Sequence, residues 1–148
     1  MEPMEINAGR FHLRPLRQDG RVDDAPALTI AHGRGVYPEY FEDAAADWEN
    51  DRVYRWAVAE QTNIELLAEV AVTPVGDDAA EVAICVAGDP ERVVEVDDPA
   101  QEPVTVADAA DAAKQAVGRW IEGHLGRVAV APRPFPGHQG QPRPVDER

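Results

Sequence analysis

The sequence predicts an α+β domain with a mixed, mostly antiparallel, twisted sheet that helices flank. Residues 53–87 contain three successive stretches in which apolar residues recur at every second position, which is typical of strands. Stretches on either side of them repeat apolar residues at spacings of three and four, which is typical of amphipathic helices. The chain has 148 residues, which suits one domain with its own core.

The three central strands are expected at residues 53–60, 64–73 and 80–87. Short polar connections at 61–63 and 74–78 predict that they form an antiparallel meander. The alternation in the first and third strands places these apolar residues on one face: Tyr54, Trp56, Val58, Val82, Ile84 and Val86.

Upstream of the meander, residues 11–17 read as an opening strand with Pro15 at an edge or a strand end. Asp23 or Asp24 is expected to cap a short helix that has Pro26 near its first turn and that ends at Gly33. A second helix is expected over 37–52, because its aromatic and alanine residues form one apolar stripe.

Downstream of the meander, residues 88–106 form a proline-containing connection in which 92–96 reads as a short strand. A long helix is expected to begin at Thr105, which resembles the start of a capping box with Asp108, and to stop at Gly126. A last strand contains Val128 and Val130. Residues 132–148 are rich in proline and predicted to be disordered, so the domain is expected to span 1–131.

The negative charge of the chain is concentrated in two segments. The net charge is −14, and residues 39–51 and 77–111 carry most of the carboxylates. Such a surface repels nucleic acid and anionic membranes, and it suits a basic partner. The candidate partner-binding residues are Glu39, Glu42, Asp43, Asp47, Glu91, Glu95, Asp97 and Asp98.

Several kinds of chemistry are excluded or disfavoured by composition. The chain has no serine, which excludes a serine nucleophile. Its one lysine, Lys114, lies in a predicted helix, which disfavours a Schiff-base role. The single Cys85 alternates with core residues and is expected to pack rather than react. The histidines lack metal-ligand spacing, so no metal site is expected. One cysteine and no apolar run of membrane length favour a cytoplasmic protein.

The order of expected elements and several local segments resemble the GNAT family of N-acetyltransferases. Within that family they resemble the group that acetylates ribosomal-protein and other amino termini. The segments are FHLRPLR (11–17), RWAVAEQTNIELLAEVAV (55–72), AEVAICVAGDP (80–90) and RWIEGHLGRVAVAP (119–132). The resemblance implies a GNAT-like fold, and the family's last helix and last two strands are expected to be missing.

The family binds acyl-CoA through a glycine-rich turn between its fourth strand and its central helix. Bare backbone N–H groups and the helix N-terminus hold the pyrophosphate there. In this chain the equivalent connection is longer, has one glycine, Gly88, and carries six carboxylates against the single Arg92. No cofactor is therefore expected, and under the alternative reading acetyl-CoA would contact Val86 and Gly88.

The family often uses a tyrosine beyond its fifth strand as the acid for the leaving thiolate, whereas the tyrosines here lie upstream. Glu81 is the one candidate for a general base on the corresponding strand. The alternative is that Glu81 is a solvated residue on the outer face of the strand without a catalytic role. Whether the chain is an enzyme stays open at this point.

Two functions follow from the sequence. The leading hypothesis is a non-catalytic protein-interaction module that binds a basic protein or occupies the groove of a nucleic-acid-binding protein. The alternative is an acyl-CoA-dependent N-acetyltransferase with an atypical cofactor loop. A homo-oligomer is a further hypothesis, because a sheet that ends after Val130 leaves an open edge.

Overall fold

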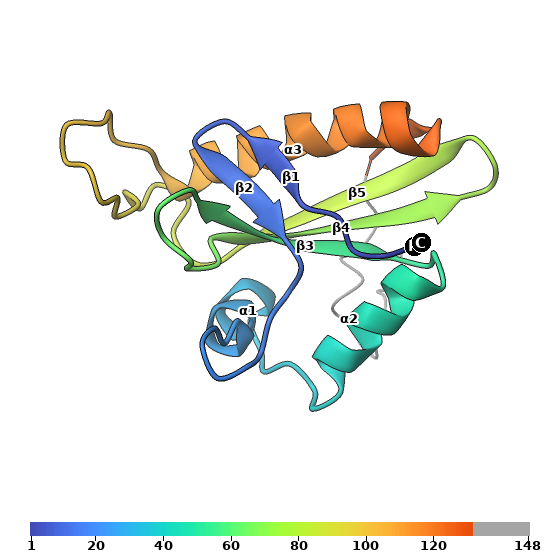
Figure 1. Cartoon of the computed structure of the whole chain (residues 1–148), viewed down its shortest axis with the longest axis horizontal. Helices are drawn as coiled ribbons and strands as arrows, with labels where there is room; N and C mark the ends of the chain where they lie inside the picture. Colours follow the sequence, from blue (N-terminus) through green and yellow to red (C-terminus); the bar gives the residue numbers. More distant parts are fainter. Residues whose placement is uncertain (132–148) are drawn as a thin grey trace, which may run out of the picture.

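The computed structural model describes residues 1–131, and the predicted tail at 132–148 lies outside the described residues. The elements follow one another as in Figure 1: β1 (Ile6–Ala8), β2 (Phe11–Arg14), α1 (Ala25–His32), α2 (Tyr40–Glu49), β3 (Tyr54–Glu60), β4 (Ala68–Val75), β5 (Ala79–Val86), α3 (Val106–Trp120), a π-helical turn (Ile121–Leu125) and β6 (Val128–Val130).

One six-stranded sheet organises the described part of the chain. Its strands follow the order β1-β2-β3-β4-β5-β6, and all neighbours are antiparallel except β5 and β6, which are parallel. Helix α3 covers one face of the twisted sheet, and α1 and α2 lie on the other (Figure 1). The predicted fold class, α+β with a mixed and mostly antiparallel sheet that helices flank, is confirmed.

The main core lies between the sheet and α3. The alternation predicted for β3 is confirmed, because Tyr54, Trp56 and Val58 share this core with the apolar stripe of α3. Trp48 joins them from the end of α2, and its ring meets that of Trp56 edge-on at 5.1 Å between centroids. The opposite face of β3 packs Ala57 into a smaller core under α1 and α2, so both faces of the strand are buried.

The second strand of the meander begins later than predicted. The expectation of a strand from residue 64 is wrong, because β4 starts at Ala68. The preceding residues form a loop in which Glu65 N–H donates to the side chain of Asn63 (2.9 Å) and Leu67 N–H donates to Val58 O (2.8 Å). The first of these is a local contact that competes with strand pairing, whereas the second already joins Leu67 to β3, and Ile64 stays exposed.

The helices before the meander are also shorter than predicted or differently capped. Helix α2 begins at Tyr40 rather than at residue 37, because a turn closed by Tyr40 N–H to Tyr37 O precedes it. Asp24 is the N-cap residue of α1, but its carboxylate binds Arg14 instead of the helix N–H groups. A hairpin strand, β1, precedes the predicted opening strand and was not expected.

Helix α3 matches its prediction most closely. Thr105 and Asp108 form the predicted capping box, and Gly126 ends the helical segment after the π-helical turn. The short strand expected over 92–96 is wrong, since only an isolated bridge joins Val93 to Thr105. Strand β6 is present and forms one edge of the sheet. The pairing of a second copy there stays a prediction that sedimentation would test.

Candidate functional site

The resemblance to N-acetyltransferases implies a phosphate-binding site at the N-terminus of α3. A helix N-terminus has four backbone N–H groups without intrahelical acceptors, and these groups can hold an anion. Here each of the four has a protein acceptor. The pairs are Thr105 N–H to Asp108 Oδ2 (2.9 Å), Val106 N–H to Arg92 O (3.0 Å), Ala107 N–H to Pro90 O (2.7 Å) and Asp108 N–H to Thr105 Oγ1 (3.2 Å).

The connection between β5 and α3, which we call the acidic loop (residues 88–105), folds back on itself and places the Pro90 and Arg92 oxygens as two of those acceptors. Val94 N–H donates to Val104 O at 2.8 Å, which brings the two ends of the loop together. Its outer part lies against the β3–β4 connection, since Asp97 N–H donates to Thr62 Oγ1 and Asn63 Nδ2 donates to Glu95 O, both at 3.2 Å. The helix N-terminus is thus closed by the loop.

The charge of the acidic loop also opposes a polyanion. Four of its carboxylates are exposed, those of Glu91, Glu95, Asp97 and Asp98. The guanidinium of Arg92 forms an ion pair with Glu65 at 3.1 Å. Each carboxylate about 8 Å from a phosphate charge costs roughly 0.5–2 kcal/mol for effective dielectric constants between about 80 and 20. The residues at this junction therefore do not fit the pyrophosphate of an acyl-CoA.

The residues predicted for acyl transfer are not brought together. Glu81 is half-buried, and its register partners are Thr73 of β4 and Val130 of β6. Val86 lies five residues further along β5, about 17 Å away along the strand. Gly88 follows with a φ of 99°, which favours glycine, and lies next to Ile30 of α1.

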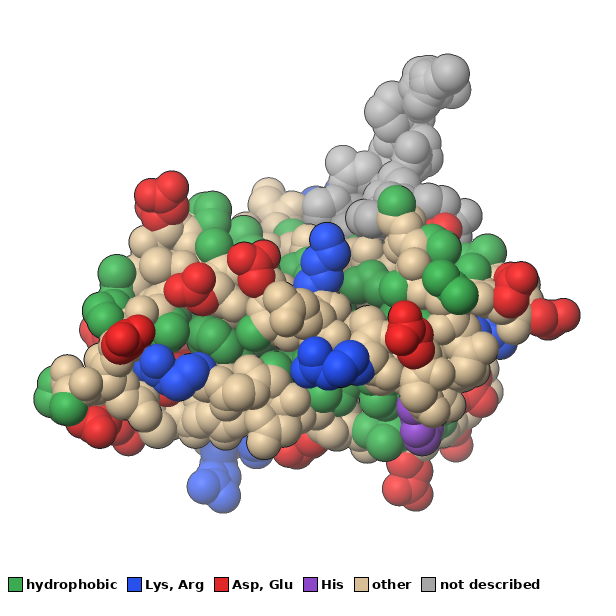
Figure 2. All heavy atoms as spheres, turned by 90° about the horizontal axis from the view of Figure 1, so that it is seen from above, with side chains coloured by type: hydrophobic (Ala, Val, Ile, Leu, Met, Phe, Trp, Pro, Cys, Tyr) green, Lys and Arg blue, Asp and Glu red, His purple; other side chains and the backbone are tan. Residues whose placement is uncertain are grey.

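The acidic segment of α2 lies apart from the acidic loop. In Figure 1, α2 packs below the sheet, whereas the loop projects at the opposite end, next to the start of α3. Two of the α2 carboxylates have internal partners. Asp43 accepts a hydrogen bond from the Tyr37 hydroxyl at 2.8 Å, and Asp47 pairs with Arg52 at 3.0 Å. Figure 2 shows acidic side chains spread over the α3 face with basic ones between them. The predicted partner-binding residues thus form two separate surfaces.

A buried polar cluster under α1 and α2 was not predicted. Glu69 of β4 accepts from Tyr40 (2.6 Å), contacts His32 Nε2 (2.6 Å) and pairs with Arg55 Nη1 (3.6 Å). Burial, followed by the charge of Glu69, raises the pKa of Tyr40 well above its usual value. The sequence signal was present, because the alternation places Arg55 and Glu69 on the same inward face of their strands.

A small polar pocket of about 240 Å³ opens beside this cluster. Two of its lining residues, Tyr40 and Arg55, belong to the cluster, and the others come from α2 and its flanks: Tyr37, Asp43, Ala44, Asp47 and Arg52. Its carboxylates and Arg55 already have partners in the protein. The cluster links α1, α2, β3 and β4, and its two charged side chains are nearly inaccessible to solvent, so we interpret it as structural.

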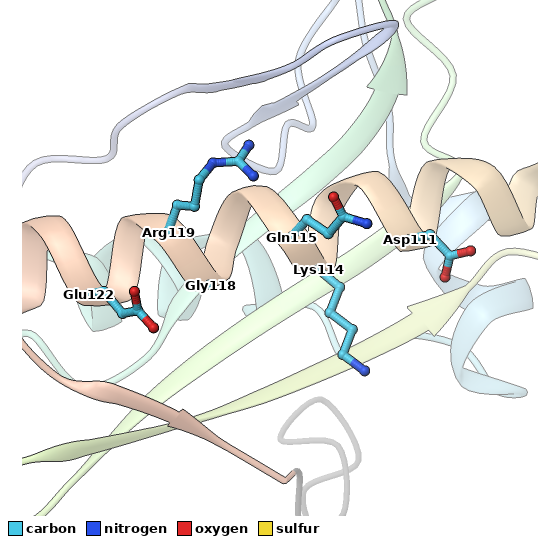
Figure 3. Close-up of a pocket in the computed structure, with 6 residues that line it drawn as sticks. All are labelled: Asp111, Lys114, Gln115, Gly118, Arg119 and Glu122. Atoms are coloured by element: carbon cyan, nitrogen blue, oxygen red, sulfur yellow. The ribbon is translucent and has the colours of Figure 1, made fainter.

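A hollow of about 640 Å³ lies on the outer face of α3 (Figure 3). Its walls come from one helix, and Figure 3 shows Lys114 and Arg119 pointing to opposite sides of the helix axis. The described lining residues are Asp111, Lys114, Gln115, Gly118, Arg119 and Glu122. Because its two cations do not converge on one point, this hollow lacks the geometry of an anion site.

Cys85 lies on β5 opposite Glu69, and its thiol donates to the backbone oxygen of Ala31. Burial, followed by the negative charge of Glu69, raises the pKa of the Cys85 thiol to about 11. The thiol is therefore protonated at neutral pH, which supports the prediction that it packs rather than reacts.

We predict that iodoacetamide alkylates Cys85 in the folded protein at pH 8 about a hundredfold more slowly than in the unfolded chain, whose thiol has a pKa near 8.5. The rate should rise about tenfold for each pH unit up to pH 10, because the thiolate fraction rises in this way below the pKa. Mass spectrometry of the labelled chain measures both rates. A rate that levels off near pH 8.5 would contradict the raised pKa.

No protein-family model and no curated protein matches the chain. Among solved structures, it is similar to a Vibrio cholerae protein that is provisionally described as a ribosomal-protein-serine acetyltransferase. The two share 17% identity with a TM-score of 0.48, and the match covers 59% of this chain and 57% of that one. This chain thus spans little more than half the length of that protein.

The residues described hold no group of three or more His, Cys, Asp or Glu side chains that could bind a metal ion. Within the same residues, the helices are too short or too polar to cross a bilayer.

Proposed function

We propose that this chain is a non-catalytic binding protein of GNAT-like fold that presents its acidic loop to a basic protein. The observation that carries the proposal is the closure of the α3 N-terminus, where the four backbone N–H groups are bonded to Pro90, Arg92, Thr105 and Asp108. A cofactor phosphate would have to displace these acceptors and then lie among carboxylates.

The positions of the groups that acyl transfer would need also support a non-catalytic protein. Glu81 lies far along β5 from Gly88, the Cys85 thiol is protonated, and the three tyrosines precede the meander or begin it. These positions do not assemble a base and an acid around one reacting atom.

The acidic loop is a better docking surface for a basic partner than the acidic segment of α2. The carboxylates of Glu91, Glu95, Asp97 and Asp98 project from a segment whose one base is already paired. On α2, by contrast, Asp43 and Asp47 have internal partners. A basic protein, including a nucleic-acid-binding protein whose groove the loop would occupy, fits this surface by charge complementarity.

Calorimetry with acetyl-CoA tests the non-catalytic part of the proposal. We expect no binding at millimolar ligand, because the displaced hydrogen bonds and the carboxylates oppose it. Saturable binding of one acetyl-CoA in the micromolar range would overturn the proposal and would favour the alternative, an acyl-CoA-dependent N-acetyltransferase with an atypical cofactor loop.

Matched charge variants test the docking surface with a lysine heptapeptide as the probe. The loop variant carries Glu91→Gln, Glu95→Gln, Asp97→Asn and Asp98→Asn, and the control carries Glu39→Gln, Glu42→Gln, Asp43→Asn and Glu49→Gln. Both remove four negative charges from a chain of net charge −14. We expect the loop variant to lose about tenfold or more in affinity and the control to lose much less, with salt weakening the wild type. Equal losses would show that net charge alone attracts the peptide, which would contradict the proposal.

A further inference from the structure

A groove of about 310 Å³ lies between α1 and the β3–β4 connection, next to the acidic loop. One wall comes from α1, with Pro26, Ala27 and Ile30, and the other comes from the connection, with Ile64 and Leu66. The side chains within it are mainly apolar, and charged residues stand at its rim. Such a surface is typical of an interaction site.

Two large apolar residues at the mouth of the groove are exposed to solvent. Ile30 is 61% exposed and Ile64 is 59% exposed, whereas Leu66, deeper in the groove, is 2% exposed. Ile30 faces outward because Leu28 and His32 occupy the buried side of α1. A partner that covered both isoleucines would remove apolar surface from water, which favours association.

The walls of the groove are held in place by a buried ion pair. The Asp24 carboxylate, at the start of α1, accepts from both Nη atoms of Arg14 at 2.9 Å. Arg14 Nη2 also donates to the backbone oxygen of Ile64 at 2.8 Å. Both walls are therefore tied to the same guanidinium, so the groove exists before a partner arrives, which lowers the entropic cost of binding.

The charge beside the groove selects the kind of partner. Asp23 and Glu65 are exposed at its rim. The acidic loop borders the wall that contains Ile64, through the Arg92–Glu65 ion pair (3.1 Å) and the contact of Asn63 with Glu95 O. Arg21 is the one cation among the groove's described lining residues. An apolar side chain with basic neighbours would therefore match both the apolar lining of the groove and the negative charge beside it.

We propose that this groove binds an aliphatic side chain of the basic partner, flanked in the partner sequence by lysine or arginine. The inference rests on the proposed function, because the acidic loop supplies the electrostatic half of the contact. The volume lies at the lower end of small-ligand clefts, so it suits one or two side chains rather than a large cofactor.

Two peptides test the groove: a leucine flanked on each side by three lysines, and the lysine heptapeptide in which lysine replaces that leucine. Fluorescence anisotropy measures both affinities, and amide chemical shifts locate the contact. We expect the leucine peptide to bind about tenfold more tightly and to shift the signals of Ile30 and Ile64. In the Ile30→Gln/Ile64→Gln variant this advantage should disappear, while the Val128→Gln control, at another exposed apolar residue, should keep it.

The two proposals fail in different ways in this experiment. Equal affinities of the two peptides, or a leucine advantage that survives in Ile30→Gln/Ile64→Gln, would overturn the groove as a docking site and would leave the acidic loop untouched. Failure of the lysine heptapeptide to bind at low salt would instead overturn the proposed function and this inference with it. Because both isoleucines are exposed, the variants should fold, which circular dichroism checks.

Discussion

The Glu69→Ala variant is expected to lose about 3–5 kcal/mol of unfolding free energy. Glu69 is fully buried, and its carboxylate is the shared partner of Tyr40, His32 and Arg55. Removing it takes away the carboxylate that lies 3.6 Å from the buried guanidinium of Arg55, and it takes away the acceptor of the Tyr40 hydroxyl. Leaving a buried charge and a buried donor unpaired is costly because water cannot replace the lost partners.

Urea denaturation of the variant and the wild type measures this loss. Glu69→Gln keeps the shape and a hydrogen-bond acceptor but removes the charge, so we expect a smaller loss of about 1–3 kcal/mol. Glu42→Ala, at an exposed position on α2, should change the stability by less than about 0.5 kcal/mol. If Glu69→Ala were as stable as the wild type, the interpretation of this cluster as structural would be wrong.

The Trp56→Ala variant should be destabilised by a similar amount, about 3–5 kcal/mol. Trp56 is fully buried at the centre of the main core, where its ring meets Trp120 at 5.0 Å and Trp48 at 5.1 Å between centroids. Its indole N–H also donates to the backbone oxygen of Met4 at 2.6 Å, which ties the N-terminal segment to the sheet. The alanine leaves a cavity among three elements that cannot all close around it.

Thermal unfolding followed by circular dichroism tests this prediction, with Val128→Ala as the control because that residue is 61% exposed. The control should differ from the wild type by less than about 0.5 kcal/mol. Trp56→Phe separates the two contributions, since it fills most of the cavity but cannot donate to Met4. A loss below about 1 kcal/mol for Trp56→Ala would mean that the aromatic core does not hold the sheet to α3.

Elements whose signals are local in sequence were predicted well. The capping box of Thr105 and Asp108 and the alternation of Tyr54, Trp56 and Val58 follow from the spacing of residues within one element. The start of β4 was predicted wrongly because Ile64 and Leu66 continue the apolar alternation, whereas the loop before Ala68 is set by side-chain hydrogen bonds. The hairpin strand β1 gave too short a signal to detect.

The sequence by itself determined the α+β class, the order of the main helices and strands and the negative charge of the connection before α3, because periodicity, capping residues and charge are properties of the chain alone. The tertiary structure alone decided how that charge acts. It brought the backbone oxygens of Pro90 and Arg92 onto the α3 N-terminus, and it placed Ile30 opposite Ile64 beside the acidic loop. These contacts join backbone groups or residues far apart in the chain, which carry no signal in local spacing.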